Sequence, residues 1–314
     1  MRSCIKIIMS IALSFSFLPV AAISAEFPRK PITIIVPYGA GGSNDNFVRA
    51  LTRPLKKAFG TNIVVRNVSG GGGAVGTMIA LAHKPDGYTV TITSNALYTL
   101  QGLGNVKFKT SDLDVIARVA TEPYVLAVKT RDEWSSLKRF VQSASKNSIT
   151  LGYAGVGSST HIMAQAITNE LGIKAKLIPF GGGSAAVAAT LGGHIDGVVL
   201  TPAGVASGLE SGKLTAIAAT GTSTQLPDVT LFTEQGYSID TLQWRGIAAP
   251  AGLAPDVKAK WVNAIAQAIQ DEDFKKAVRN IGVDVNPAYG EQLERFVQDG
   301  SEKLITLTRT ALAK

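Results

Sequence analysis

The stretch that most constrains this chain is Pro37–Asp45, a glycine-rich loop between an apolar segment and a helical pattern. Ile32–Val36 predicts a buried strand, and Phe47–Leu55 carries apolar residues at the spacing of one helix face. Glycines let a ligand approach the backbone, Ser43 is a favourable N-cap, and first-turn N–H groups lack intrahelical partners. An anion site and an ordinary strand-to-helix turn both fit this loop. Asp45 fits the helix dipole more simply than a general-base role.

Residues 1–25 have the parts of a secretory signal peptide. A basic start is followed by an apolar run over residues 7–20 and by small residues up to Ala25. The run is too short to span a bilayer, and no other stretch of the sequence is long and apolar enough. We expect cleavage after Ala25, with Ala22 as the second choice, and export to the periplasm.

Cysteine usage excludes several kinds of chemistry. Cys4 is the only cysteine and precedes the expected cleavage point, so the mature chain has no thiol. Disulfides, zinc–cysteine sites and cysteine catalysis are therefore excluded. The chain has 314 residues, 46% hydrophobic and 17% charged, which is enough for two domains with proper cores.

The charge of the mature chain is positive. Removal of residues 1–25 takes away two basic residues and no acid, so the formal net charge falls from +8 to +6. A positive field favours anionic ligands. The basic residues are scattered, as in Lys56-Lys57 and Lys275-Lys276, and are not interleaved with aromatic residues, so we expect no nucleic-acid partner.

Strands and helices alternate along most of the chain, which is typical of a parallel α/β sheet, and this alternating series occurs twice along the sequence. We expect two similar lobes with a cleft between the carboxyl ends of their strands. Pro54 interrupts the first helix, where we expect a kink. Further strands are expected at 62–66, 88–93, 124–128, 150–153, 175–178, 197–200 and 216–219. Helices are expected near 77–83, 137–145, 161–171, 203–211, 257–269, 273–280 and 292–312, and an alanine-rich helix is expected to end at 191.

Gly71–Gly76 matches the G-x-G-x-x-G pattern of dinucleotide-binding proteins. The strand expected after it ends in Ser94-Asn95, where a ribose-binding acid would be needed, and the motif follows the second strand of the series. We interpret the motif as a tight turn with close backbone packing and expect no cofactor.

Gly155–His161 is a second candidate anion loop, with hydroxyls and N–H groups at a helix start. Ser158 and His161 also permit a hydrolase, but neighbours in sequence seldom converge as nucleophile and base, and no G-x-S-x-G is present. We interpret His161 as a capping or ligand-positioning residue. His83 and His194 lie beside turns and are expected on the surface. No pair of histidines has metal-ligand spacing, so we expect no metal site.

The order and spacing of several short pieces resemble the periplasmic solute-binding proteins of tripartite tricarboxylate transporters, the Bug receptors. The resemblance covers essentially the whole mature chain. The matching pieces are Val36-Pro37-Tyr38 with Gly41-Gly42-Ser43 and Asp45, Asn67 with Gly70, Gly72-Gly73 and Gly76, Pro85 to Thr89, Gly157-Ser158 with His161, Pro179-Phe180, Leu191-Gly192-Gly193 with Asp196, Gly212-Lys213-Leu214, Leu226 to Val229, and Ala249 to Gly252.

The resemblance implies an α/β fold of the two-lobed, type II periplasmic-binding-protein kind, in which each lobe is a mixed sheet flanked by helices and the ligand lies between the lobes. We place the two chain crossings near Tyr124 and Trp244. Residues 26–123 and 246–314 would then form one lobe, and residues 124–245 the other.

The resemblance also implies how a ligand is held. In this family, backbone N–H groups of the first loop typically hold a ligand carboxylate, often through waters and without an arginine. The ligand-binding residues that it implies here are Tyr38, Gly41, Gly42, Ser43, Asn44, Asp45, Ser94, Asn95, Gly157, Ser158, Ser159, Thr160, His161, Phe180 and Thr201.

One departure from the family bears on the ligand. Leu200-Thr201 stands where many members have an acid and an amide that read the distal end of the ligand. The missing acid argues against an amino group at that end. A di- or tricarboxylate, a hydroxyacid, or an aromatic acid resting on Tyr38, Tyr98 or Phe180 stays open.

The expected function is therefore that of an exported, monomeric receptor, not an enzyme. It would capture a small organic carboxylate by lobe closure and deliver it to a membrane permease. Two alternatives remain: an exported serine hydrolase using Ser158 and His161, and a ligand-sensing partner of a signalling kinase.

Overall fold

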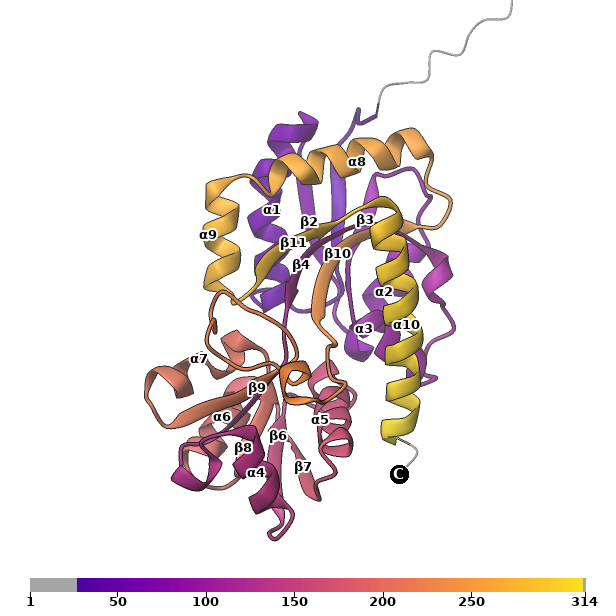
Figure 1. Ribbon diagram of the computed structural model, residues 1–314. Coiled ribbons are helices and arrows are strands. Elements are labelled where there is room, and N and C mark those ends of the chain that lie inside the picture. The colour runs from indigo at the N-terminus through magenta and orange to yellow at the C-terminus, as the bar shows by residue number, and fades with distance from the viewer. Residues whose placement is uncertain (1–26, 313–314) are drawn as a thin grey trace, which may run out of the picture.

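The computed structural model describes residues 27–312, so the predicted signal peptide lies outside the described residues. Two lobes stand one above the other, and each is a β-sheet flanked by helices (Figure 1). The predicted two-lobed α/β architecture is confirmed. Between residues 27 and 312, no helix is both long and apolar enough to cross a membrane.

The first lobe is built on six strands: β1 (Ile32–Val36), β2 (Ile63–Asn67), β3 (Thr89–Ser94), β4 (Leu113–Glu122), β10 (Gln243–Pro250) and β11 (Asp284–Ala288). Their order across the sheet is β11-β4-β10-β3-β1-β2. The flanking helices are α1 (Ser43–Phe59), α2 (Ala74–Leu81), α3 (Ala96–Gly102), α8 (Pro255–Ala268), α9 (Glu272–Asn280) and α10 (Gly290–Leu312).

The second lobe is built on five strands: β5 (Val125–Lys129), β6 (Ile149–Tyr153), β7 (Ala175–Pro179), β8 (Gly197–Leu200) and β9 (Leu214–Ala219). Their order is β7-β6-β8-β5-β9. Helices α4 (Leu137–Ala144), α5 (Ser159–Glu170), α6 (Gly183–Leu191) and α7 (Pro202–Glu210) cover this sheet. The predicted strands and helices of this lobe agree with the structure to within a few residues.

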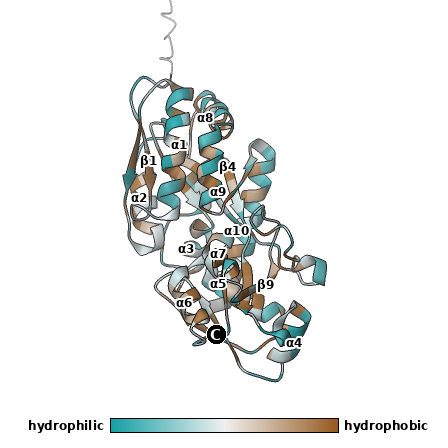
Figure 2. Ribbon diagram, turned by 90° about the vertical axis from the view of Figure 1, so that its left-hand side faces the viewer, coloured by the Kyte–Doolittle hydropathy of each residue, from teal (hydrophilic) through white to brown (hydrophobic). Residues whose placement is uncertain are grey.

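The core of the first lobe explains the predicted helix faces. Phe47 and Leu51 of α1 are fully buried, as are Trp261 and Ile265 of α8, and the two helices pack together. Burying one such side chain contributes roughly 1.5–3 kcal/mol. In Figure 2, α1 and α8 also carry many hydrophilic residues, whereas β9 is largely hydrophobic. Helix α1 continues through Pro54 as one element from Ser43 to Phe59.

Both sheets are mixed, as the family resemblance implies, so the parallel arrangement expected from the strand–helix alternation does not extend to every strand. Strand β10 runs antiparallel to both β3 and β4, β11 is antiparallel to β4, and β5 is antiparallel to β8 and β9. Strands β4, β10 and β11 and helix α3 were not predicted at all. Strand direction depends on the partner chosen across the sheet, which local periodicity does not reveal.

Two chain crossings join the lobes. Strand β4 ends at Glu122 in the first sheet, and β5 begins at Val125 in the second. On the return, β10 enters the first sheet at Gln243, three residues before the boundary expected at residue 246. The exact division into lobes stays a prediction. Helix α10 runs along the first lobe and reaches α5 of the second (Figure 1).

Candidate ligand-binding cleft

A cavity of about 530 Å³ lies between the lobes, at the carboxyl ends of β1, β3 and β6. Its first-lobe wall is formed by Tyr38, Asn44, Gly71, Gly72, Ala74, Ser94, Ala96, Thr99, Leu100, Leu103, Asn105 and Gln243. Its second-lobe wall is the loop from β6 to α5, with Ala154, Gly155, Val156, Gly157, Ser158 and Ser159. None of these lining residues carries a charged side chain.

Asp45 closes the first loop on itself. Its side chain is 2% exposed and accepts hydrogen bonds from the Gly41 N–H at 2.8 Å, Arg49 Nε at 2.8 Å and Asn67 Nδ2 at 2.9 Å. The Arg49 hydrogen bond is the main cause that lowers the pKa of Asp45 to about 2. A carboxylate ionised at all ordinary pH values is a poor general base, so Asp45 acts here as a structural anchor.

The start of α1 differs from the sequence prediction in two ways. The N-cap is Gly42, and Ser43 is the first helical residue, so Ser43 does not cap the helix. Asp45 also takes the N–H of Gly41, which was expected to face a ligand. The free donors at this end are the first-turn N–H groups, beginning with those of Ser43 and Asn44.

Arg245 on β10 reaches this loop, and sequence reasoning missed it. Arg245 Nε donates to Asn44 Oδ1 at 3.0 Å, and its Nη2 donates to Ser43 Oγ at 3.0 Å and to Glu122 Oε1 at 2.7 Å. Burial raises the pKa of Glu122, and the charge of Arg245 opposes this rise. No local sequence signal marks these residues, because Arg245 lies 123 positions from Glu122 and about 200 from the loop.

Side chains from both crossings meet beneath the cleft. Asn95 is fully buried and donates through Nδ2 to Tyr124 Oη at 3.2 Å and to the Leu242 carbonyl at 2.8 Å. Tyr124 Oη donates in turn to Gln243 Oε1 at 2.8 Å. Tyr124 follows the first crossing and Gln243 ends the second, so this network ties the two crossings to β3 and α3.

The second loop is ordered by its own side chains. Ser158 caps α5, accepting through Oγ from the His161 N–H at 3.2 Å, and Thr160 Oγ1 accepts from the Ala154 N–H at 3.0 Å. His161 Nδ1 accepts from the Gly157 N–H at 3.2 Å, and its ring stacks on Tyr153 at 4.4 Å between centroids.

This arrangement does not pair a nucleophile with a base. Ser158 Oγ contacts the backbone N–H of His161 and Thr160 Oγ1, and no hydrogen bond joins it to the imidazole of His161. Burial lowers the pKa of His161, so the ring is neutral near pH 7. The structure thus gives no geometric support to a serine hydrolase at this loop.

Six predicted site residues line the cleft: Tyr38, Asn44, Ser94, Gly157, Ser158 and Ser159. The other nine do not line it: Gly41, Gly42, Ser43, Asp45, Asn95, Thr160, His161, Phe180 and Thr201. Four of these nine support the loops or the crossings through hydrogen bonds, namely Asp45, Asn95, Thr160 and His161, whereas Gly41, Gly42 and Ser43 are exposed. Thr201 is the N-cap residue of α7 and has its side chain beside Glu122.

Two aromatic residues expected to support a ligand face elsewhere. Phe180 packs with the apolar core of the second lobe, and Tyr98 is fully buried against Trp244. Of the three aromatic residues considered, Tyr38 alone lines the cleft. Burial raises the pKa of Tyr38, while Ser94 and Arg245 oppose the rise, so its hydroxyl is a neutral hydrogen-bond donor.

The glycine motif serves close packing. A Cβ added at Gly76 would lie 2.6 Å from Pro37 Cα and 2.7 Å from the Val68 carbonyl oxygen. The start of α2 therefore packs directly against the first loop. Gly71 and Gly72 have positive φ and place their backbone at the cleft wall.

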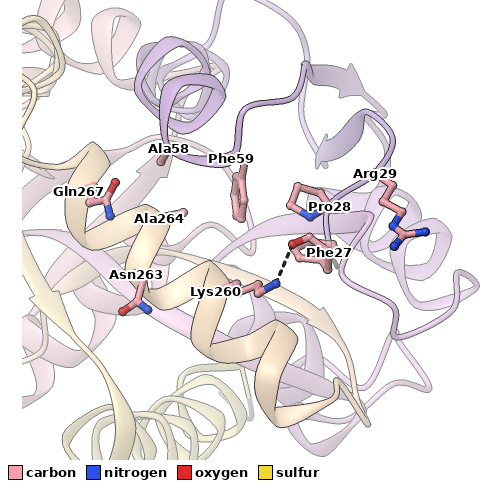
Figure 3. Close-up of a pocket in the computed structure, with 9 residues that line it drawn as sticks. All are labelled: Phe27, Pro28, Arg29, Ala58, Phe59, Lys260, Asn263, Ala264 and Gln267. Atoms are coloured by element: carbon pink, nitrogen blue, oxygen red, sulfur yellow. Dashed lines mark hydrogen bonds between the residues drawn. The ribbon is translucent and has the colours of Figure 1, made fainter. Parts of the chain in front are cut away.

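A second cavity of about 560 Å³ lies on the outer end of the first lobe (Figure 3). Phe27, Phe59 and Lys260 are among its lining residues, and Lys260 Nζ donates to the Phe27 carbonyl at 3.1 Å. It contains no predicted site residue and lies away from the second lobe, so we take the interlobe cleft as the candidate site. Within residues 27–312, no three histidine, cysteine, aspartate or glutamate side chains gather as metal ligands would.

Comparisons with known proteins agree with this assignment of the fold. The chain is 28% identical over 299 residues to a UPF0065 protein in the gbd 5' region of Cupriavidus necator, covering 93% of this chain and 90% of that protein. It is 28% identical over 304 residues to BugT of Bordetella pertussis, covering 94% and 93% of the two chains.

A solved structure of a TctC solute-binding protein from Polaromonas superposes with a TM-score of 0.84 at 28% identity, covering 91% of this chain and all of that one. The two-lobed periplasmic-binding-protein fold is thereby confirmed. The family model for the tripartite tricarboxylate transporter family receptor matches residues 47–311. The chain therefore belongs to the tripartite tricarboxylate transporter receptor family, as the sequence resemblance predicted.

Proposed function

We propose that this protein is a periplasmic receptor that captures a small organic carboxylate in the interlobe cleft and delivers it to a membrane permease. The observation that carries the proposal is the convergence of two helix N-termini on one cavity. Helix α1 begins at Ser43 in the first lobe and α5 begins at Ser159 in the second, and residues at both starts line the cleft.

Helix N-termini suit an anion in this setting. Each carries unpaired N–H groups and the positive end of the helix dipole. Hydroxyls of Tyr38, Ser94 and Ser158 add neutral donors around the same cavity. Because no lining side chain is charged, the negative charge of the ligand would be met by backbone and hydroxyl groups.

The family relationship supports the partner and the compartment. Receptors of tripartite transporters work with membrane permease subunits, and the signal peptide predicted over residues 1–25 agrees with export. We retain residues 26–123 with 246–314 and residues 124–245 as the proposed lobes. The ligand would stabilise the state in which it touches both lobes.

Isothermal titration calorimetry of the mature protein against pairs of acids and their amides tests the proposal. We expect at least one carboxylate among hexanoate, benzoate, succinate and citrate to bind, and its amide to bind at least about tenfold more weakly. Equal binding of acid and amide, or no binding of any acid, would contradict the proposal.

A pair of cap variants locates the site. Ser158→Ala removes a cap and a cleft hydroxyl, so we expect about fivefold weaker binding. Ser136→Ala removes the matching cap of α4 outside the cleft, and we expect it to lower stability by about 1 kcal/mol without changing affinity. Equal effects of the two variants on affinity would place the ligand elsewhere.

A further inference from the structure

Helix α3 contributes a row of apolar side chains to the first-lobe wall of the cleft. Ala96, Leu100 and Leu103 line the cavity at helical spacing. The start of this helix is fixed at the crossings, because Asn95 is bonded to Tyr124 and Leu242. Leu103 lies about 10 Å further along the helix axis, at the outer end of the cleft.

The second-lobe wall runs in the same direction. Ser159 has its side chain beside Tyr124, at the inner end. Gly157 lies at the outer end, where an added Cβ would be 3.3 Å from Leu103 Cδ1. The neighbouring Val156 also lines the cavity and is 74% exposed. The outer end is thus formed mainly by Leu100, Leu103 and Val156.

Polar groups concentrate at the inner end, which holds Ser94, Asn44, Ser159 and Gln243. Two polar side chains also line the α3 side, but neither carries a charge. The Thr99 hydroxyl donates to the Ala96 carbonyl at 3.2 Å, and Asn105 is exposed at the rim.

The guanidinium that reaches the start of α1, that of Arg245, is already paired. Arg245 forms a 2.7 Å ion pair with Glu122, so the two side chains together are neutral. The N-termini of α1 and α5 can therefore meet one carboxylate at the inner end. A second carboxylate on the same ligand would face leucine and valine, whose side chains donate no hydrogen bond to it.

On the basis of the proposed function, we infer that the ligand is a monocarboxylate with an apolar body, an aliphatic or aromatic acid, and not a di- or tricarboxylate. Its carboxylate binds at the inner end, between the starts of α1 and α5. Its apolar body lies along Leu100 and Leu103.

Calorimetry with hexanoate and adipate tests the inference, since these acids have the same carbon chain and differ by one terminal carboxylate. We expect hexanoate to bind at least tenfold more tightly than adipate. From propionate to hexanoate, each added methylene should tighten binding up to about fourfold, as expected for burial of a CH₂ group. Benzoate should likewise bind more tightly than terephthalate.

A matched pair of variants tests the role of Leu103. Leu103→Asn should reduce the ratio of hexanoate to propionate affinity at least fivefold, and this ratio does not depend on how much protein is folded. Leu81→Asn changes a half-buried leucine of α2 outside the cavity and should leave the ratio unchanged.

The failures of the inference and of the proposed function are distinguishable. Adipate binding as tightly as hexanoate, or a hexanoate-to-propionate ratio unaffected by Leu103→Asn, would overturn the inference while leaving a carboxylate receptor in place. Absence of binding by mono-, di- and tricarboxylates alike would overturn both.

Discussion

Arg245 Nη2 donates to Glu122 Oε1 at 2.7 Å, and both residues are at least 95% buried. The pair joins β10 to the end of β4, where the chain leaves the first lobe. The same guanidinium holds Ser43 and Asn44 at the start of α1. The position of the proposed anion site is therefore coupled to the crossing between the lobes.

Replacing Arg245 should destabilise the protein, because the buried Glu122 would lose its cationic partner. In Arg245→Ala, burial would raise the pKa of Glu122 further above its ordinary value of 4.5, because the opposing cation is gone. We expect a loss of about 3–5 kcal/mol in the free energy of unfolding at pH 8. A carboxyl group whose pKa is raised by folding destabilises the folded state when it is ionised. The loss should therefore be smaller at pH 5, where a larger fraction of Glu122 is protonated.

Urea denaturation at both pH values measures this effect. The double variant Arg245→Met with Glu122→Leu serves as the control, because it leaves no unpaired buried charge. We expect it to be more stable than Arg245→Ala at pH 8. A loss of the same size at both pH values in Arg245→Ala would contradict the account.

Asp45 should stabilise the first loop through its charge. Its pKa is lowered from 3.8 to about 2, so its contribution is complete above pH 3.8 and is lost as the pH falls through 2. Since its partner Arg49 is half exposed, we expect Asp45→Asn to cost about 1–2 kcal/mol at pH 7. In guanidinium denaturation, the difference in free energy of unfolding between the wild type and Asp45→Asn should shrink as the pH falls from 7 to 2. A difference that stays constant with pH would show that the charge of Asp45 does not stabilise the loop.

The fold was predictable where local patterns suffice. Strand β1 and helix α1 were placed correctly because an apolar run, glycines and helical spacing all lie within 30 residues. Strand β4 was missed, since Asp114 and Arg118 interrupt its apolar pattern. Arg118 is nevertheless buried, because it donates to the carbonyl and the side-chain oxygen of Asn286, 168 positions away.

His161 should behave as a neutral hydrogen-bond acceptor. Burial lowers its pKa below 6.5, and protonation would remove the acceptor that Nδ1 offers to the Gly157 N–H. Because folding lowers the pKa of His161, the neutral ring contributes its full stabilisation above pH 6.5, and this contribution declines as the pH falls. NMR titration should give a midpoint below 6.5, and a midpoint above 6.5 would contradict this.

A stability comparison isolates the same group. His161→Phe retains a ring against Tyr153 but offers no acceptor and no charge. Between pH 7 and pH 5, the wild type should therefore lose more stability than His161→Phe. Parallel loss in the two proteins would show that His161 does not titrate as described.

Gly282 should control how the lobes meet. An added Cβ would lie 2.4 Å from Ala203 Cβ, across the interface between the first lobe and α7 of the second. We expect Gly282→Ala to separate the lobes, which small-angle scattering would record as a larger radius of gyration. Gly236→Ala is the matched control, because its φ is also positive but nothing lies within 4 Å of the added Cβ. An equal radius of gyration in both variants would refute the steric role.

The candidate site was predictable in part. The two loops that carry Tyr38 and Ser158 were identified because glycines, hydroxyls and helix starts coincide in the sequence. The residues that hold the first loop in place were not predictable, because Arg245 and Glu122 come together only through antiparallel pairing of β10 with β4. Phe180 was placed in the cleft by resemblance, but its ring packs into the second core.

A crystal structure of the mature protein with its tightest-binding acid tests the central claim most directly. We predict that the ligand carboxylate lies within hydrogen-bond distance of N–H groups at the start of α1 and of groups at the start of α5, with its body along Leu100 and Leu103. A carboxylate at the outer end of the cleft, or a ligand in the cavity beside Phe59 and Lys260, would contradict the account.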